Sequence, residues 1–600
     1  MGWQFSSNVA SPYFCRYTAP MQTENYDIIV IGAGHNGLTS AAYLAKAGYN
    51  VLCLERRHIV GGAVVTETDL VEGFRLDTCS SYHVVINGTP VIADLELEKF
   101  GLEYLDVDPW GFAPFPNGNY IMFYRDVDRT AESIARFSPR DAAAYRAFMR
   151  RWMRFNETMM AVFCAPPTPG GMAGAVLRHE LKDGRWRSLF RESLTGPAET
   201  AAMLRTIFSP YGKVIEETFE SEEVRAALSW LGAQSGPGPD EPVSGELLAM
   251  QQSLYHLLGV RRPKGGSGML TQALARCLEH HGGTVKVNQA VRRILVENGR
   301  VSGVETVTGD RYSAPLVISN AHVQTTLLKL LPEGTLRPGL RKRVKNIKVA
   351  NGFGMTVRYA MDRLPNYTVL PTRNEMGEVL AGEQHRAMQL LCPSPGYLRQ
   401  TYADARAGRP PEKPAVIAMT PVVVDPTLAP PGKQVLYIWA QTHPFRLSNG
   451  EDWTDIKQRE ADKCLQVVED FAPGIKEAVL GQYIKSPVDL EEIGGLVGGN
   501  LMHIDMSIGQ MFMFRPLPEL ANYRTPVKGL YLTGASTHPG GGVSGAPGYN
   551  TAHRVLSDLA RTGNEPRPGL VKAGAFGLGF GLGLLASKKY KQPPRAPETE

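Results

Sequence analysis

Four consecutive apolar residues, Ile28–Ile31, stand out near the N-terminus of the chain. A short run of β-branched residues is typical of a parallel strand that is buried on both faces. Good helix formers follow from Leu38 to Ala47, and the segment Asn50–Leu54, which is apolar from Val51 onward, comes next. The pattern predicts a strand, a helix and a second strand in one parallel sheet.

A glycine turn joins the first strand to the helix. Gly32, Gly34 and Gly37 form G-x-G-x-x-G, and Glu55 follows about twenty residues later at the end of the second strand. This combination predicts a dinucleotide whose pyrophosphate meets the helix N-terminus and whose ribose hydroxyls bind the carboxylate. Gly61 and Gly62 follow this acid. Flavin enzymes of the glutathione-reductase-like type carry a glycine pair at this place, so the pair favours FAD over NAD. The predicted FAD contacts are Gly32, Ala33, Gly34, Gly37, Glu55, Arg56, Gly61, Gly62 and Ala63.

The middle of the chain changes from helical to strand patterns. Apolar residues recur at helical spacing from Glu132 to Phe163, where Ser138 and Pro139 predict a cap and a first-turn proline. Three later β-branched segments predict an antiparallel sheet under a ligand: Gly352–Ala360, Val416–Val424 and Gln434–Gln441. Either an apolar pocket or an ordinary sheet core accounts for Met355, Val357, Ile417, Met419, Tyr437 and Trp439.

The first pattern returns twice. Gly265 and Gly266 precede a predicted helix from Met269, and a late strand, Leu530–Thr533, runs into a glycine loop with a helix near Tyr549. We therefore predict an α/β fold, a glutathione-reductase-like Rossmann FAD domain with an interleaved α+β substrate domain of antiparallel sheet and helices. The predicted division is an extension (1–25), the FAD domain (26–90, 263–330, 495–562), the substrate domain (91–262, 331–494) and a tail (563–600).

Composition narrows the class of protein. A chain of 600 residues with 43% hydrophobic content is large enough for several cores, and a net charge of +5 without a basic, aromatic-rich run gives no indication of nucleic acid binding. Seven scattered cysteines without C-x-x-C indicate thiols in a reducing compartment.

Thirteen histidines without H-x-x-H or H-E-x-x-H predict no metal site, which argues against a di-iron ketolase. Residues 1–25 resemble neither a signal nor a transit peptide, and Met21 is an alternative start.

Longer phrases identify a family resemblance. The phrases GLEYLDVDP, SPRDAAAYRAF, RPKGGSGMLTQAL, VDPTLAPPG, NLMHIDMSIGQMFMFRPLPELANYRTPVKGLYLTG and THPGGGVSGAPG run between about Tyr26 and Ala560. They resemble the carotenoid (phytoene) desaturase-like FAD oxidoreductases, above all the desaturase-type β-carotene ketolases. They are also similar to the mitochondrial phytoene-desaturase-like oxidoreductases of animals. The resemblance implies further FAD contacts at Val291, Gly534, Ala535, Gly542, Val543, Ser544 and Gly545.

The resemblance also implies a reaction. We expect 4-ketolation of β-carotene, in which FAD accepts hydride from an allylic ring carbon, water adds, and a second oxidation gives the ketone. The electron acceptor would be oxygen or a quinone. His503, Asp505 and His83 are the catalytic candidates, and each has a structural hydrogen-bonding role as its alternative. Another polyene desaturase, isomerase or saturase is a competing function, whereas the intact glycines and Glu55 argue against a cofactor-free carrier of prenylated partners.

The tail suggests where the protein works. No apolar run reaches the roughly 18–20 residues that a spanning helix needs. Ala573–Ala586 is apolar and is followed by Lys588, Lys589 and Lys591, which predicts contact with one leaflet, and a glycine-rich tail without a role is the alternative. We expect a cytoplasmic protein in peripheral contact with a membrane. The animal relatives make the mitochondrial matrix the alternative.

Overall fold

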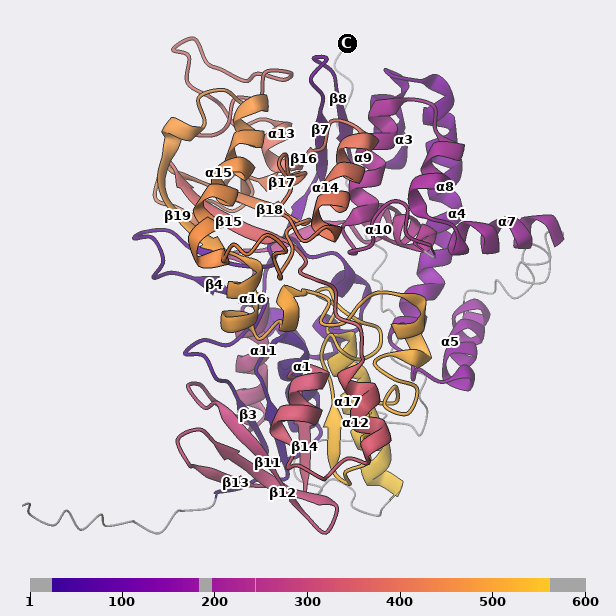
Figure 1. Ribbon diagram of the computed structural model, residues 1–600, viewed down its shortest axis with the longest axis vertical. Helices are drawn as coiled ribbons and strands as arrows, with labels where there is room; N and C mark the ends of the chain where they lie inside the picture. Colours follow the sequence, from indigo (N-terminus) through magenta and orange to yellow (C-terminus); the bar gives the residue numbers. More distant parts are fainter. Residues whose placement is uncertain (1–23, 183–196, 243, 562–600) are drawn as a thin grey trace, which may run out of the picture.

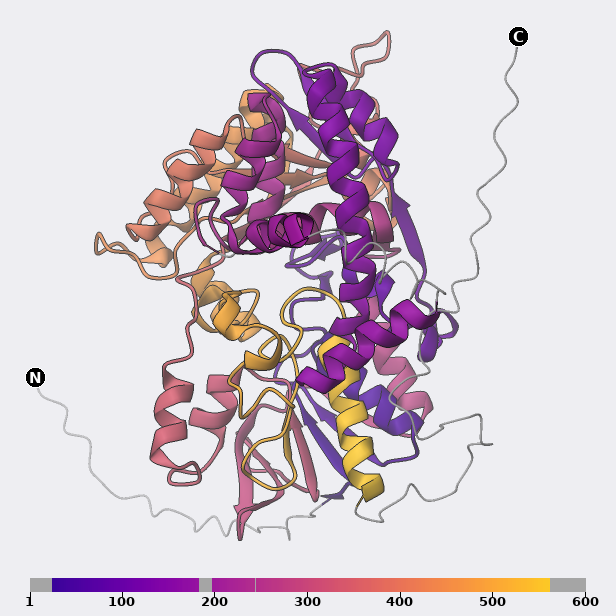
Figure 2. The ribbon, with the colours of Figure 1, turned by 90° about the vertical axis from the view of Figure 1, so that its right-hand side faces the viewer.

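The computed structural model describes residues 24–182, 197–242 and 244–561. Figure 1 shows two regions stacked along the long axis, each built around its own sheet, and Figure 2 shows helix α17 (Ala546–Arg561) beside the lower sheet. Residues 1–23 of the N-terminal extension and the apolar segment of the tail, Ala573–Ala586, lie outside the described residues.

The lower region contains a parallel sheet of five strands. Its order is β10 (Thr284–Lys286), β3 (Val51–Leu54), β2 (Ile28–Ile31), β14 (Leu316–Ser319) and β20 (Leu530–Leu532). These strands come from three separate segments of the chain, which supports the discontinuous division that we propose. The predicted strand, helix and strand at the N-terminus are confirmed, although α1 (His35–Lys46) begins three residues earlier than expected.

Both faces of this sheet are covered because alternate side chains of β2 point to opposite sides. Ile28 and Val30 pack against α1, α11 (Met269–His280) and α17. Ile29 and Ile31 pack in a second core on the other side. That core includes a four-stranded sheet in the order β1 (Glu24–Asn25), β13 (Arg311–Ser313), β12 (Arg300–Thr306) and β11 (Val291–Glu297), with helix α12 (Pro338–Lys345).

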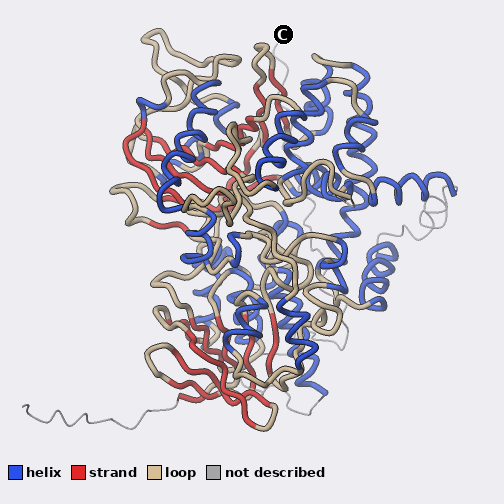
Figure 3. The backbone as a smooth tube through the Cα atoms, in the orientation of Figure 1, coloured by secondary structure: helices blue, strands red, loops and turns tan. Residues whose placement is uncertain are grey.

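The upper region is built on a sheet of seven strands, coloured red in the upper half of Figure 3. It is antiparallel except where β16 pairs with β7. Helix α15 (Trp453–Phe471) packs against one face. The strand order is β19 (Val479–Lys485), β15 (Met355–Met361), β18 (Gln434–Ala440), β17 (Val416–Met419), β16 (Met388–Leu391), β7 (Gly111–Pro114) and β8 (Tyr120–Phe123).

The register of this sheet shows on which face each of the predicted residues lies. Trp439 pairs with both Thr356 and Ile417, so these side chains share the face opposite α15. Met355 and Val357 have the opposite parity on β15 and are buried in the core with α15. Met355 and Val357 therefore follow the second expectation, an ordinary sheet core, because a one-residue offset along a strand places a side chain on the opposite face.

Helices enclose the remaining face of the upper sheet. The predicted helix across Glu132–Phe163 is two helices, α3 (Val127–Ala135) and α4 (Pro139–Phe163). The Ser138 hydroxyl accepts the Asp141 N–H at 3.1 Å and caps α4, as expected. The other helices on this face are α8 (Tyr211–Thr218), α9 (Glu222–Ala233), α10 (Gly245–Leu258) and α14 (Pro395–Arg406). Helix α5 (Pro169–Lys182) packs against α4, and α7 (Pro197–Phe208) packs against α10.

Buried polar groups connect the two regions. Asp77, at the end of the short strand β5 (Leu76–Asp77), forms an ion pair with Arg262 at 2.8 Å, and neither side chain is exposed to solvent. The Asp77 N–H donates to the hydroxyl of Tyr437 on the seven-stranded sheet at 2.8 Å. Asp425 accepts the Gly265 N–H at 2.8 Å from the same side. The polar network thus joins strand β5 and the turn before α11 to the seven-stranded sheet and the loop after β17.

Candidate cofactor and substrate cavity

One large cavity, of about 690 Å³, lies between the two sheets. Its floor is formed at the carboxyl ends of the parallel strands, where ligands of open α/β sheets bind. The predicted contacts that line it are Gly32, Gly34, Glu55, Arg56, Gly62, Ala63, Val291, Ala535, Gly542 and Val543. The predicted contacts outside its lining are Ala33, Gly37, Gly61, Gly534, Ser544 and Gly545.

The N-terminus of α1 opens onto this cavity. Gly34 is its N-cap residue, no side chain caps the helix, and its first turn has no acidic residue. The free N–H groups and the positive end of the helix dipole are therefore available for an anionic ligand. Gly37 lies behind the turn, and a Cβ there would stand 2.1 Å from the Gly32 carbonyl oxygen. Gly37 is thus required for the contact between helix and strand.

Glu55 is buried at the end of β3 and is held by backbone groups. Its Oε2 accepts the Ala33 N–H at 2.9 Å, and its Oε1 accepts the Arg57 N–H at 3.0 Å. These two bonds orient the carboxylate and leave further lone pairs for ribose hydroxyls. Arg56 donates instead to the Glu492 and Ile493 carbonyls, at 2.8 Å each, and so anchors the end of helix α16 (Pro487–Gly494).

The glycine loop after β20 forms another wall. A Cβ on Gly542 would have no atom within 4 Å, so this residue borders open space. Gly545 instead packs against Val91, and helix α17 begins at Ala546 rather than near Tyr549.

Gly541, in the same loop, packs against Met502. A Cβ there would lie 2.4 Å from the Met502 sulfur and 2.8 Å from the Met502 Cα. A larger residue at 541 would displace this neighbouring loop before it reached a ligand in the cavity.

The three catalytic candidates have different environments. His503 lines the cavity. Asp505 does not, and its carboxylate pairs with Lys348 at 2.8 Å. His83 lies outside the lining, with Nδ1 bonded to the Tyr104 hydroxyl at 2.8 Å and Nε2 bonded to the Ser267 hydroxyl at 2.9 Å. Burial lowers the pKa of His83 to about 3, so His83 is a neutral structural residue with both ring nitrogens satisfied.

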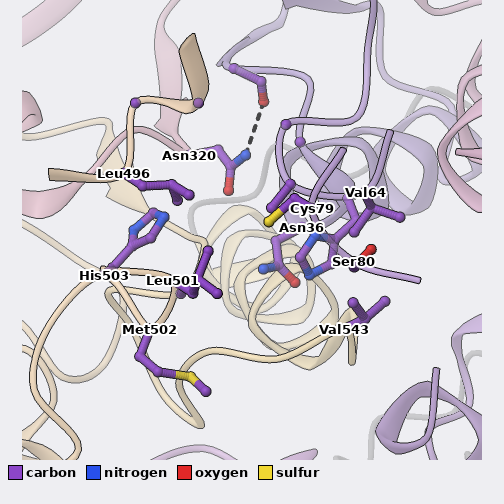
Figure 4. Close-up of a pocket in the computed structure, with 18 of the residues that line it drawn as sticks. Asn36, Val64, Cys79, Ser80, Asn320, Leu496, Leu501, Met502, His503 and Val543 are labelled. Atoms are coloured by element: carbon purple, nitrogen blue, oxygen red, sulfur yellow. Dashed lines mark hydrogen bonds between the residues drawn. The ribbon is translucent and has the colours of Figure 1, made fainter. Parts of the chain in front are cut away.

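Sequence reasoning missed several residues that line the cavity. Asn320 directly follows β14, and its Nδ2 donates to the Gly32 carbonyl at 3.2 Å (Figure 4). Its position at the carboxyl end of a parallel strand was the signal that would have identified it. His35 occupies a variable position within the glycine motif, and His322 follows Asn320 by two residues. Nothing in a glycine motif specifies which side chain faces a ligand.

Unpartnered polar atoms show what kind of ligand the cavity fits. His35 Nε2, Asn36 Oδ1, Tyr82 Oη and Gln289 Oε1 are buried, belong to lining residues, and have no hydrogen-bond partner within the described ranges. Such atoms are costly unless a ligand satisfies them. Together with the uncapped helix and the oriented Glu55, they fit a dinucleotide with many polar groups, as FAD has.

The roof of the cavity has a different character. It includes Ile417, Met419 and Trp439 of the seven-stranded sheet, with Phe353 stacked on Trp439 at a centroid distance of 5.7 Å. Arg358 also reaches this wall, but its guanidinium donates to the carbonyls of Asp77, Cys79 and Ile438. The cavity therefore joins a polar floor to a largely apolar roof.

Comparisons with known proteins agree with this geometry. The flavin-containing amine oxidoreductase family matches residues 37–360. Rat pyridine nucleotide-disulfide oxidoreductase domain-containing protein 2 is 35% identical over 558 residues, covering 89% of this chain and 94% of that protein. A limonene dehydrogenase component of Castellaniella defragrans is 28% identical, with 90% and 96% covered. A neurosporene-forming phytoene desaturase of Cereibacter sphaeroides is 25% identical, also with 90% and 96% covered.

Solved structures confirm the predicted fold class. An oxidoreductase from Methanosarcina mazei superposes with a TM-score of 0.56 at 19% identity, covering 88% of this chain and all of that one. Cyclohexylamine oxidase from Brevibacterium oxydans superposes with a TM-score of 0.54 at 16% identity, covering 89% of this chain and all of that one. The predicted resemblance, the FAD cofactor and the oxidoreductase class are all confirmed. The chain belongs to the flavin-containing amine oxidoreductase family and is an FAD-dependent oxidoreductase.

Proposed function

We propose that the protein oxidises an allylic carbon of a carotenoid, and specifically that it converts β-carotene to a 4-keto product. The observation that carries the proposal is the apolar roof of the FAD cavity, formed by Ile417, Met419 and Trp439. A hydrocarbon substrate has no polar atoms to satisfy, so its binding depends on apolar area of this kind.

The relatives support the substrate class. Limonene and phytoene, which appear in the names of two relatives that align along most of the chain, are both isoprenoid hydrocarbons. The amine oxidases among the structural relatives share only the fold, at identities below 20%. A hydrocarbon with activated C–H bonds is therefore the substrate class that we propose.

The cavity suits loss of hydride without a strong acid or base. FAD, when bound, supplies the two-electron acceptor. A polyene delocalises the resulting positive charge, and the faces of Trp439 and Phe353 stabilise a cation next to them. Burial lowers the pKa values of His35 and His322 to about 4, so both rings are neutral at pH 7. Water then adds as a hydroxide equivalent and releases a proton. After the proposed electron acceptor, oxygen or a quinone, has reoxidised the flavin, a second loss of hydride and proton gives the ketone.

Pigment analysis tests this function. A β-carotene-producing host that expresses the chain should accumulate a 4-keto carotenoid, and Trp439→Ala should lower its yield at least tenfold because apolar and cation-stabilising area is lost. Met376→Ala is the matched control, because Met376 is 80% exposed, and it should leave the yield unchanged. Further desaturated or isomerised polyenes without a carbonyl would exclude the ketolase.

A specific observation favours a second candidate. The rat and mouse pyridine nucleotide-disulfide oxidoreductase domain-containing protein 2, at 35% and 34% identity, are more similar to this chain than the limonene and phytoene enzymes are. We propose as the alternative an oxidoreductase of that type with a substrate other than a carotenoid, or another isoprenoid desaturase, isomerase or saturase of the same family. The same pigment analysis, extended to total isoprenoid extracts, separates the two.

We also propose peripheral contact with a membrane, in the cytoplasm or alternatively in the mitochondrial matrix, with oxygen or a quinone as the electron acceptor. Within residues 24–182, 197–242 and 244–561, no helix is long and apolar enough to span a bilayer. Two helices do expose apolar pairs at i, i+4 spacing: Leu177 and Leu181 on α5, and Leu204 and Phe208 on α7. Such pairs supply area for insertion into one leaflet.

Flotation with anionic liposomes tests the contact. Leu181→Glu with Phe208→Glu should reduce the bound fraction severalfold, because two charges oppose insertion. Replacement of Leu480, which is 53% exposed on the distant strand β19, is the control. Equal flotation of all forms would remove α5 and α7 from the membrane surface and leave the tail to be tested by deletion after Arg567.

A further inference from the structure

His503 has an unusual backbone that the surrounding residues hold firmly in place. Its φ is 63°, in the left-handed region that non-glycine residues seldom adopt. The His503 N–H donates to the Asn500 carbonyl at 3.0 Å, and its own carbonyl accepts from His322 Nε2 at 3.0 Å. The preceding carbonyl, of Met502, accepts from buried Arg515 at 2.7 Å. Strain maintained by several bonds is typical of functional positions.

Ser536 determines which nitrogen of His503 carries the proton. The Ser536 hydroxyl oxygen accepts the Val323 N–H at 3.1 Å and lies 3.0 Å from His503 Nδ1. Ser536 is only 1% exposed, and His503 Nδ1 is the one acceptor for its hydroxyl hydrogen among the described residues. The hydroxyl therefore donates to Nδ1, and His503 is neutral with its N–H at Nε2. His503 Nε2 has no partner within the described residues, and its ring lies at the cavity wall (Figure 4).

His35 presents the opposite chemistry. Its ring hydrogen-bonds to the Gly542 backbone, and this bond raises the pKa of His35. A bond that favours the protonated ring is one in which a ring N–H donates to the carbonyl. Because Nε2 is the unpartnered nitrogen, Nδ1 is the donor and Nε2 has a free lone pair. The two rings are near enough for a charge on His35 to lower the pKa of His503. One wall of the cavity thus presents an acceptor at His35 and a donor at His503.

We propose that His35 and His503 bind the ribityl hydroxyls of FAD as an acceptor and donor pair, with Ser536 as the positioning residue that sets the tautomer of His503. A hydroxyl group both donates and accepts, so it matches the pair. Phosphate oxygens only accept and would leave His35 Nε2 unsatisfied. A hydrocarbon substrate has neither a hydrogen-bond donor nor an acceptor, so it does not match the pair. Only this exclusion of the substrate rests on the proposed function.

FAD binding to the refolded full chain tests the proposal by flavin fluorescence, independently of any substrate. His503→Leu and His35→Leu should each weaken FAD binding about tenfold, as expected for one buried hydrogen bond. His503→Gln keeps an N–H donor, and glutamine and leucine are equally strained at the positive φ of this position. His503→Gln should therefore retain most of the affinity that His503→Leu loses. Ser536→Ala should weaken binding about threefold because the tautomer is then mixed. His443→Leu, at a buried histidine outside the cavity, is the control and should leave the affinity unchanged.

FAD analogues that lack single ribityl hydroxyls give a second, variant-free test. At least one such analogue should bind the wild-type chain about tenfold more weakly than FAD, and His503→Leu should abolish that difference. ADP, which lacks the ribityl chain and the flavin ring, should bind wild type and His503→Leu equally well. Full affinity for every deoxy analogue, or an equal loss in His503→Gln and His503→Leu, would overturn the assignment.

Discussion

Glu55 shows how a local motif determines a binding group. Backbone N–H groups of Ala33 and Arg57 hold both carboxylate oxygens, so the side chain is oriented before any ligand binds. A hydrogen bond to a charged group contributes about 1.5–3 kcal/mol. Glu55→Gln should therefore weaken FAD binding roughly 10- to 100-fold, measured by fluorescence titration.

The control for Glu55 is a glutamate on the surface. Glu103 pairs with Lys264 and is 60% exposed, so Glu103→Gln should leave FAD affinity unchanged. Equal affinities of Glu55→Gln and wild type would contradict the role of this carboxylate in ribose binding.

The sequence predicts single residues well where backbone geometry alone requires them. Gly37 is an example, since any Cβ there collides with the Gly32 carbonyl oxygen. It predicts side-chain ligands poorly, as the unexpected positions of His35 and Asn320 show. Whether such a side chain faces the cavity depends on how strands from separate segments of the chain are arranged in the parallel sheet. The sequence around one residue does not contain this information.

At the scale of elements, strands were easier to predict than their faces. β15, β17 and β18 all lie within or close to the predicted segments. The sequence left open whether Met355 and Val357 line a pocket or lie in the sheet core, where the structure has them, because the alternation within a strand does not reveal its register with the next strand. β7 joins this sheet from more than two hundred residues away in the sequence, and no local pattern indicated that pairing.

The loop that carries His503 depends on one guanidinium. Arg515 is fully buried and donates to backbone carbonyls of Met502, Gln510 and Ala535. Arg515→Met should leave these acceptors unsatisfied, at a cost of about 1–3 kcal/mol each. We expect faster limited proteolysis between residues 502 and 514 and weaker FAD binding.

Arg524→Met is the matched control for Arg515, because Arg524 pairs with Asp558 near the surface and its side chain is 45% exposed. Its proteolysis pattern should resemble that of wild type. An unchanged pattern in Arg515→Met would mean that the loop is held by other contacts.

At the scale of the whole molecule, the buried pair of Asp77 and Arg262 belongs to the polar network that contacts the seven-stranded sheet through Tyr437. Removing one partner of a buried pair costs about 3–5 kcal/mol, because the other charge stays buried. Asp77→Asn should lower the free energy of unfolding by this amount in chemical denaturation. The neighbouring pair of Asp106 and Arg261 is the control, since Asp106 is 63% exposed and Asp106→Asn should change stability by less than about 1 kcal/mol.

Buried histidines make the stability of the molecule depend on pH. Burial lowers the pKa values of His322, His443 and His538 to about 4, against about 6.5 in an unfolded chain. Between these values the unfolded chain binds more protons than the folded one, so stability rises with pH from about 4 to 6.5 and is lost on acidification. The free energy of unfolding should therefore be clearly lower at pH 5 than at pH 7.

His443→Phe isolates one of these protons. His443 lies outside the cavity, beside Trp453 and with Nε2 3.9 Å from Glu460, and Lys463 also lowers its pKa. One histidine fewer should reduce the slope of stability against pH near pH 5 by about 1.4 kcal/mol per pH unit, while FAD content stays the same. The slope is obtained from denaturation midpoints at four pH values between 4.5 and 7. If the slope is the same in variant and wild type, His443 is protonated in the folded protein, and the acid sensitivity must come from the carboxylates.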